Sequence, residues 1–434
     1  MTLTHYLESE LSDQQRSELL KRPNIDFGTL FSRVQPILDS VQTEGDTAVA
    51  RWNTTFDGQS AQSLVVNPHE EKISLPPEVQ EAIDLAFSNI EAFHRAQLGQ
   101  NLRMETMPGV ECQKIMRPIA AVGLYVPGGT AILPSTAMML AIPAMIAGCT
   151  TRVLASPPNA EGALAPEIVY IAQKAGITHL LKAGGAQAIA AMAFGTESVP
   201  KVDKLFGPGN QYVTAAKMLA QQSEAQVSFD MPAGPSEVLV IADHNARPDF
   251  VAADLLSQAE HGSDSQVVVL YTPGFSFEEL TVELEKQLDQ LPRRELAAKA
   301  LQNSFALASE SVQSALDFSN NYAPEHLIVN VTRAEEYLNQ IEHAGSVFLG
   351  AYTPESVGDY ASGTNHTLPT YGYARMYSGV HLASFQKSMT VQQLSKKGLQ
   401  AIGPAVETLA QREGLEAHKN AVSIRLKTLP STHE

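Results

Sequence analysis

The chain has 434 residues and a formal net charge of −17 at pH 7, because 47 Asp and Glu outnumber 30 Lys and Arg. Nucleic acids and anionic membranes attract a basic face, so this charge disfavours both as principal partners. Hydrophobic residues make up 44% of the chain and charged residues 18%, which excludes wholesale disorder and allows a large buried core. The two cysteines, Cys112 and Cys149, have no CxxC spacing, so neither a disulfide scaffold nor a thiolate zinc knuckle is available.

Neither a membrane span nor a signal peptide is expected. The longest apolar run, residues 137–147, is too short to cross a bilayer and contains Pro143. The N-terminal stretch 1–15 is polar and acidic, unlike a signal peptide. The composition therefore predicts a cytoplasmic globular protein of the α/β class.

The pattern of apolar residues changes near residue 117. Residues 1–116 are predicted to be largely helical, with Pro76 and Pro77 opening a helix. Beyond them, short β-rich runs alternate with helical stretches of small residues, and the runs are 119–126, 152–155, 179–181 and 204–206. Continuous apolar runs of this kind predict a parallel sheet that is covered on both faces.

A second series of the same kind follows. Its predicted strands are 237–242, 266–271, 327–331 and 346–349, and its predicted helices are 248–260 and 277–290. We therefore expect a first α/β domain at 117–235 and a second at 236–380. Residues 381–434 lack strand runs and are predicted to form a helical tail. Seven Lys and Arg against four Glu give that tail a net charge of +3, so it could dock on its own acidic body or on a partner's. The alternative is a pair of solvated helices without such docking.

Three glycine-rich turns follow predicted strands of the first series, at 125–130, 184–187 and 207–212. Such turns let backbone N–H groups approach a ligand, and open α/β sheets bind ligands at the carboxyl edge of their strands. None of them is a GxGxxG motif, so composition alone does not imply a dinucleotide. Each turn by itself could be a plain turn.

A candidate metal pair ends the predicted helix 248–260. His261 follows this helix, and Gln258 lies three residues back on the same face. Carboxylates bind Zn²⁺ far more often than amides, so ligand chemistry alone ranks Glu260 above Gln258. The alternative is that His261 only caps the helix, where its side chain interacts with the helix dipole.

Further candidates come from separate segments. Glu325 and His326 enter a predicted strand and offer an acid–base pair of different pKa. Neighbours in a strand point to opposite faces, so both reach one cavity only if the backbone there is irregular.

Asp359 lies in a predicted loop rich in Gly and Ser, and His366 follows that loop. The tail adds Glu413 and His418, which are five residues apart and so not on one helix face. Donors drawn from separate segments are typical of a metal site in a cleft.

Several long motifs resemble histidinol dehydrogenases. The run FDMPAGPSEVLVIA (229–242), continuing through 254–261, is similar to the signature of that family. The other matching motifs are VGLYVPGG (122–129), GGAQAIAA (184–191), FGPGN (206–210), PEHL (324–327), GDYASGTNHTLPTYG (358–372) and EAHKNAV (416–422). The resemblance covers essentially the whole chain, and the one departure noted is Phe229, where the family has an aliphatic residue.

The resemblance implies a homodimer of incomplete Rossmann-like domains that oxidises L-histidinol to L-histidine through L-histidinaldehyde. Two NAD⁺ and one Zn²⁺ per site are implied, and the C-terminal tail completes the partner's site. The implied zinc ligands, which also contact substrate, are Gln258, His261, Asp359 and His418. The implied acid–base pair is Glu325 and His326, the other substrate contacts are Ser236, His326, His366 and Glu413, and the NAD⁺ contacts are Tyr125, Gln187 and Asn210.

Two other classes of function remain open from the residues alone. A zinc hydrolase would use the same kinds of ligand but would need no dinucleotide. A non-catalytic metabolite-binding protein would explain the glycine-rich turns but not the pairing of Glu325 with His326.

Overall fold

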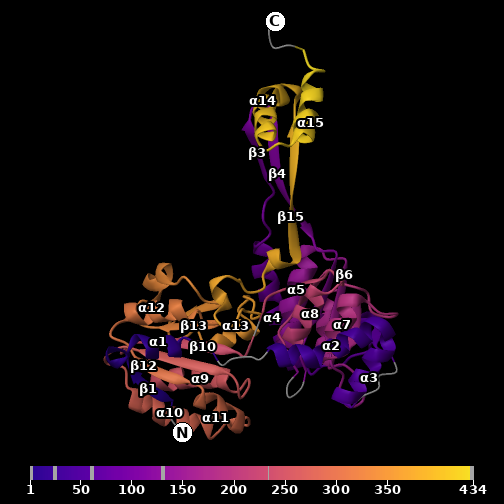
Figure 1. The fold of residues 1–434 in the computed structure, drawn as a ribbon. Coiled ribbons are helices and arrows are strands. Elements are labelled where there is room, and N and C mark those ends of the chain that lie inside the picture. Colours follow the sequence, from indigo (N-terminus) through magenta and orange to yellow (C-terminus); the bar gives the residue numbers. More distant parts are fainter. Residues whose placement is uncertain (1–2, 23–26, 59–62, 129–131, 233, 431–434) are drawn as a thin grey trace. The chain divides into compact units, whose positions relative to one another are not determined.

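A computed structural model describes residues 3–22, 27–58, 63–128, 132–232 and 234–430. The chain divides into two compact units, one made of Met1–Gln97 with Ile119–Phe385 and the other of Leu98–Pro118 with Gln386–Glu434. The first unit contains two six-stranded sheets, and the second contains a three-stranded sheet and two helices (Figure 1).

The first sheet has the strand order β2-β7-β6-β5-β8-β9. Its strands are β5 (Ala121–Tyr125), β6 (Thr151–Ser156), β7 (His179–Lys182), β8 (Lys204–Phe206), β9 (Ser228–Phe229) and β2 (Val65–Val66). All are parallel except the edge strand β2, which pairs antiparallel with β7. The parallel sheet predicted from four apolar runs is therefore confirmed.

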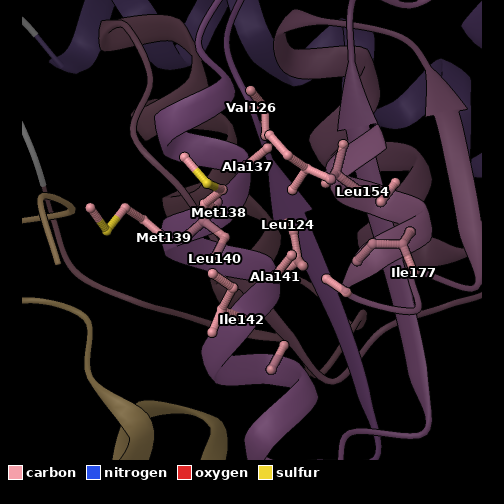
Figure 2. Packing of buried hydrophobic residues seen from close by; sticks show 14 of the residues in the cluster. Leu124, Val126, Ala137, Met138, Met139, Leu140, Ala141, Ile142, Leu154 and Ile177 are labelled. Atoms are coloured by element: carbon pink, nitrogen blue, oxygen red, sulfur yellow. The ribbon is translucent and has the colours of Figure 1, made fainter. Parts of the chain in front are cut away.

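Helices cover both faces of this sheet because its central strands are apolar on both sides. Leu124 and Leu154 pack in one hydrophobic cluster with α4 (Pro77–Ala96), α5 (Pro134–Ala147) and α6 (Pro166–Lys174). Their neighbours Tyr125 and Val153 pack in another, with α2 (Phe27–Glu44), α3 (Asp46–Asp57), α7 (Gly185–Phe194) and α8 (Gln211–Gln222). Figure 2 shows Leu124, Val126 and Leu154 beside the buried side chains of α5. The apolar run that includes Pro143 is thus a core helix, and no helix in the described part of the chain is long and apolar enough for a membrane span.

The second sheet repeats this strand order as β1-β12-β11-β10-β13-β14, here with every pairing parallel. Its strands are β10 (Glu237–Ala242), β11 (Gln266–Tyr271), β12 (Phe305–Ala308), β13 (His326–Asn330), β14 (Ser346–Leu349) and β1 (Thr4–Leu7). One face packs against α9 (Pro248–Ala259), α10 (Phe277–Leu288) and α11 (Arg294–Gln302), and the other against α1 (Asp13–Leu19) and α12 (Val312–Tyr322) (Figure 1).

The second unit corrects two predictions. The N-terminal region does not stay helical, because it ends in a hairpin of β3 (Leu102–Met107) and β4 (Val110–Pro118). The C-terminal tail is not wholly helical, because β15 (Gln386–Leu394) pairs with β4 along its whole length before α14 (Lys396–Arg412) and α15 (Glu416–Leu426) (Figure 1). Eight of the nine residues of β15 are exposed, so this strand has no apolar run that a sequence pattern could reveal.

Candidate active site

A cavity of about 680 Å³ in the first unit brings together the turns of the first sheet and the polar residues of the second. From the first sheet it is lined by Pro127, after β5, and by 207–212, after β8. These positions are at the carboxyl edge of the parallel strands, as predicted for the glycine-rich turns. The second sheet instead contributes its amino edge, since Ser236 precedes β10 and Glu325 precedes β13.

His261 reaches this cavity from the end of α9. Its Nδ1 lies 3.0 Å from the carbonyl oxygen of Ser257, and a carbonyl only accepts, so Nδ1–H donates. In the neutral ring the lone pair is then on Nε2, the usual arrangement of a metal-binding imidazole. The capping role considered for His261 is realised at one ring nitrogen and leaves the other available. Glu260 does not line the cavity, whereas Gln258 does.

Glu355 orients the amide of Gln258. The Glu355 carboxylate is fully buried and accepts a hydrogen bond of 2.9 Å from the Ser257 hydroxyl. With its nitrogen towards Glu355, the Gln258 amide donates to both carboxylate oxygens at 3.0 and 3.2 Å, whereas its oxygen would face only acceptors there. The amide oxygen is therefore the Gln258 atom left for a metal. This explains how an amide can serve where the sequence favoured a carboxylate.

Glu325 and His326 reach the same cavity because β13 begins only at His326. Both are held by the backbone of Glu237, whose N–H donates to Glu325 Oε2 at 2.8 Å and whose carbonyl lies 3.1 Å from His326 Nδ1. His326 Nδ1 therefore carries a proton. Nε2 lies 3.4 Å from Asp359 Oδ1 but is buried without a hydrogen-bond partner among the described residues. That nitrogen is placed to exchange a proton with a ligand in the cavity.

Charges in the cavity influence one another. Burial raises the pKa of Glu325. Burial lowers the pKa of His326, but the carboxylates of Glu325, Glu355 and Asp359 outweigh this effect and raise it. The pKa of Asp359 is lowered, since neighbouring imidazoles outweigh the effect of its burial. The site thus favours an ionised Asp359 and stabilises the imidazolium that His326 becomes when it accepts a proton.

Asp359 and His366 complete the second sheet's side of the cavity. Asp359 was expected in a loop, but it lies in the short helix α13 (Glu355–Tyr360). The sequence did not predict this helix because the segment is rich in Gly and Ser. His366 Nδ1 lies 2.8 Å from the Asp359 carbonyl, and its Nε2 lies 3.0 Å from the hydroxyl of Thr136 at the start of α5. His366 therefore contacts α13, which follows the second sheet's strand β14, and α5, which packs on the first sheet.

The three predicted cofactor contacts occupy different environments. Asn210 lines the cavity, and its side chain accepts from the N–H groups of Tyr212 and Val213 as the cap of α8. Tyr125 and Gln187 are buried and do not line it. The Tyr125 hydroxyl accepts from the Gly185 N–H at 3.0 Å, and the Gln187 amide donates to the Asn53 side chain at 3.2 Å. Gly129 and Thr130 of the first glycine-rich turn lie outside the described residues.

Glu413 and His418 belong to the second unit, whereas every residue that lines the cavity belongs to the first. Glu413 caps the C-terminal end of α14 and His418 lies on α15, and both are exposed. Within the described residues no group of three His, Cys, Asp or Glu is arranged to hold a metal ion. The first unit thus supplies Gln258, His261 and Asp359 as candidate ligands.

Sequence reasoning missed several residues that hold the site together. They are Arg22 and Glu237 behind the acid–base pair, Glu355 behind Gln258, and Lys217 with Asp230 behind the turn at 207–210. Among these residues only Glu237 could have been noticed in the sequence, because it is a charged residue at the start of an apolar strand. That strand is buried throughout. The other contacts join segments that are separated in the chain, so no local sequence pattern predicts them.

Known proteins resemble this chain over its whole length. The family model of histidinol dehydrogenases matches residues 20–426. A chloroplastic histidinol dehydrogenase of Arabidopsis thaliana is 57% identical, with 99% of this chain and 92% of that protein covered. A histidinol dehydrogenase of Bacteroides thetaiotaomicron is 52% identical, with 96% and 98% covered.

A crystal structure of histidinol dehydrogenase from Elizabethkingia anophelis is also similar. It covers 99% of each chain with a TM-score of 0.94 at 48% identity. The predicted family and the predicted α/β fold class are therefore confirmed. By its match to the family model, to these relatives and to this solved structure, the chain belongs to the histidinol dehydrogenase family.

Proposed function

We propose that this protein oxidises L-histidinol to L-histidine through L-histidinaldehyde, with two NAD⁺ as oxidants and one Zn²⁺ per site. The observation that carries the proposal is the cavity itself. It places a buried imidazole nitrogen without a partner among the described residues, His326 Nε2, beside three side chains that suit a metal ion. The family membership supplies the dehydrogenase class of the reaction.

The side chains in the cavity fit zinc. His261 offers a nitrogen whose ring is oriented through Ser257, Gln258 offers an amide oxygen oriented through Glu355, and Asp359 offers a carboxylate. When bound, the ion supplies a positive centre that can hold the imidazole and amine of histidinol in register with the oxidant. No thiolate takes part, so the site is expected to exchange its metal more readily than a Cys₄ site.

In the first oxidation, His326 Nε2 accepts the hydroxyl proton as the carbinol C–H gives up hydride. The Glu237 carbonyl holds the proton on Nδ1 and so fixes the nitrogen that acts. The second oxidation needs a water molecule added to the aldehyde carbon. Glu325 accepts a proton from that water, and its buried setting raises its pKa towards the range that a general base needs. As the water adds, His326 returns the proton from the first oxidation to the carbonyl oxygen, which completes the hydrate. His326 can then accept a hydroxyl proton of the hydrate as the second hydride leaves.

The two α/β domains divide these tasks. We assign NAD⁺ binding to residues 117–235, where Asn210 lines the cavity and Tyr125 and Gln187 are buried residues of the other two glycine-rich turns. When bound, NAD⁺ accepts the hydride. We assign the metal and the acid–base pair to residues 236–380. Ser236 and His366, which line the cavity, contact the substrate.

The remaining residues come from a second copy of the chain. We assign Glu413 to substrate binding and His418 to the metal, each from the tail of the partner subunit in a homodimer. The basic charge of residues 381–434 beside an acidic remainder supports such docking.

The direct test follows NADH formation after histidinol is added to the zinc-loaded protein. Two NADH per histidine are expected, since each oxidation reduces one NAD⁺. A zinc hydrolase or a metabolite-binding protein would form no NADH, and one NADH per substrate with free aldehyde would contradict the second oxidation.

A further inference from the structure

The backbone of Glu237 contacts both Glu325 and His326, although Glu237 does not line the cavity. It is the first residue of β10, and its N–H and carbonyl are the groups that hold Glu325 and His326. A small rotation of the peptide planes on either side of Glu237 would therefore move both side chains at once.

The Glu237 side chain is clamped by an arginine from the N-terminal segment. Arg22 Nε donates to Oε1 at 3.0 Å and Nη2 donates to Oε2 at 2.9 Å, so the guanidinium binds the carboxylate through both oxygens. The backbone N–H of Tyr371 adds a third hydrogen bond, to Oε1 at 2.9 Å. The Arg22 and Glu237 side chains are only 7% and 2% exposed, so the pair is desolvated as well as bidentate.

Arg22 is itself held in one orientation. Its guanidinium carbon lies 3.3 Å from the centre of the Tyr322 ring, and its Nη1 donates to the Leu20 carbonyl at 3.1 Å. The Tyr322 hydroxyl donates to Gln266 Oε1 at 2.6 Å, and Gln266 pairs with Glu237 across β10 and β11. The contacts of the clamp therefore run from Glu237 on β10 through Arg22 and Tyr322 to Gln266, the neighbour of Glu237 on β11.

We infer that Arg22 is a positioning residue for the acid–base pair: by clamping the Glu237 carboxylate, it fixes the backbone that orients both Glu325 and His326. The inference rests on the proposed function of this pair. Arg22 acts without touching substrate, cofactor or metal ligand. Its loss misplaces both acid–base groups together, and shifts of about an ångström cost on the order of 10²-fold in rate.

The test compares Arg22→Met, Arg22→Lys and the double variant Arg22→Met with Glu237→Gln in the zinc-loaded protein. For Arg22→Met we expect kcat to fall roughly 10- to 100-fold in both half-reactions, with KM for NAD⁺ and zinc content unchanged. Arg22→Lys keeps the charge but loses the bidentate fork, so its kcat should be intermediate. The double variant removes the stranded buried carboxylate, so its thermal midpoint should recover while its kcat stays low.

A matched control is available in the same segment. Arg16 pairs with Glu8 at 2.9 Å and lies 5.9 Å from the ring of Phe318, which is on the same helix as Tyr322. Arg16 does not line the cavity. Arg16→Met should leave kcat unchanged. Recovery of kcat together with stability in the double variant would show that Arg22 acts on stability alone, and it would overturn the inference.

Two further outcomes separate this inference from the proposed function. A wild-type protein that forms no NADH from histidinol would overturn the proposed function, and the inference with it. A wild-type protein that turns over while a folded Arg22→Met variant is unimpaired would overturn the inference alone. If Arg22→Met does not fold, Arg22→Lys carries the same comparison.

Discussion

The two six-stranded sheets of the first unit have the same strand order, yet they present opposite edges to the cavity. The first sheet contributes its carboxyl edge, where helix α8 begins after Asn210. The second contributes its amino edge, where helix α9 ends just before His261. Helix N-termini carry a partial positive charge and C-termini a partial negative one. The first edge is thus suited to an anionic dinucleotide and the second to a metal cation.

The difference also explains which kinds of residue line each side. Backbone N–H groups bind the phosphates of a dinucleotide, so the first sheet can use glycine-rich turns and few charges. The proposed binding of a cation and transfer of protons require side chains, and the second sheet presents Gln258, His261, Glu325, His326 and Asp359 at its amino edge. Under the proposed assignments the repeated fold serves two different roles, because each copy presents a different edge to the cavity.

The largest effect is expected from removing the metal. Strong chelators should abolish activity while the fold survives, since none of the proposed ligands belongs to the hydrophobic clusters that pack on the two sheets. His261→Ala should lose zinc and activity together. The matched control is His244→Ala, since His244 follows β10 at the opposite, carboxyl edge of the same sheet. Zinc content by elemental analysis and the circular dichroism spectrum measure both results, and full zinc in His261→Ala would remove that residue from the site.

The next largest effect is expected from substitutions that separate the proposed roles of Glu325 and His326. His326→Asn should lower the rates of both oxidations by the ~10²–10⁴-fold typical of a lost general base. Glu325→Gln should still interconvert histidinol and its aldehyde and should fail mainly from aldehyde to histidine, because only that step needs activated water. The two half-reactions can be measured separately by supplying the aldehyde. Equal damage to both by Glu325→Gln would contradict the division of roles.

Much of the fold could be predicted because buried parallel strands are apolar on both faces. The runs that became β5, β10 and β11 are examples. The largely exposed strands could not be predicted: β1 has no buried residue, and β15 gains its partner β4 from more than 260 residues away in the chain. The central strand β12 was missed although it is buried, because two of its four residues are alanines, which are depleted in strands, whereas the edge strand β14 was predicted. Site residues followed the same division. Residues that point into the cavity belong to motifs, whereas their supports, such as Arg22 and Glu355, are known only from tertiary contacts.

A smaller effect tests the first sheet's edge. Asn210→Ala should raise KM for NAD⁺ about ten-fold, the loss of roughly one charge-assisted hydrogen bond, while KM for histidinol stays the same. It should also cost about 1 kcal/mol of stability, because Asn210 caps α8. Ser276→Ala removes the equivalent cap of α10, away from the cavity. A similar stability loss with unchanged KM in that control separates the cofactor contact from the cap. An unchanged KM in Asn210→Ala would leave Asn210 as a cap only.

The smallest expected effect is a partial recovery of activity when two inactive variants are mixed. It tests whether the tail of another chain completes the site at the amino edge of the second sheet. His261→Ala and His418→Ala are each expected to be inactive, because each removes a proposed zinc ligand. If the tail serves the partner subunit, each site combines His261 of one chain with His418 of the other. A mixed dimer then has one site with both defects and one site with neither. Random pairing makes half of the dimers mixed, so roughly a quarter of wild-type sites should return when the two variants are unfolded and refolded together.

The control for this experiment is each variant refolded alone, which should stay inactive, together with a tagged copy that shows that mixed dimers have formed. A tail that folds onto its own chain gives a different result, since every site then keeps one defect whatever the pairing. Mixed dimers without any activity would therefore exclude the shared site. Activity near a quarter of wild type, with normal KM for histidinol, would mean that the intact sites are complete and that His418 reaches them from the partner subunit.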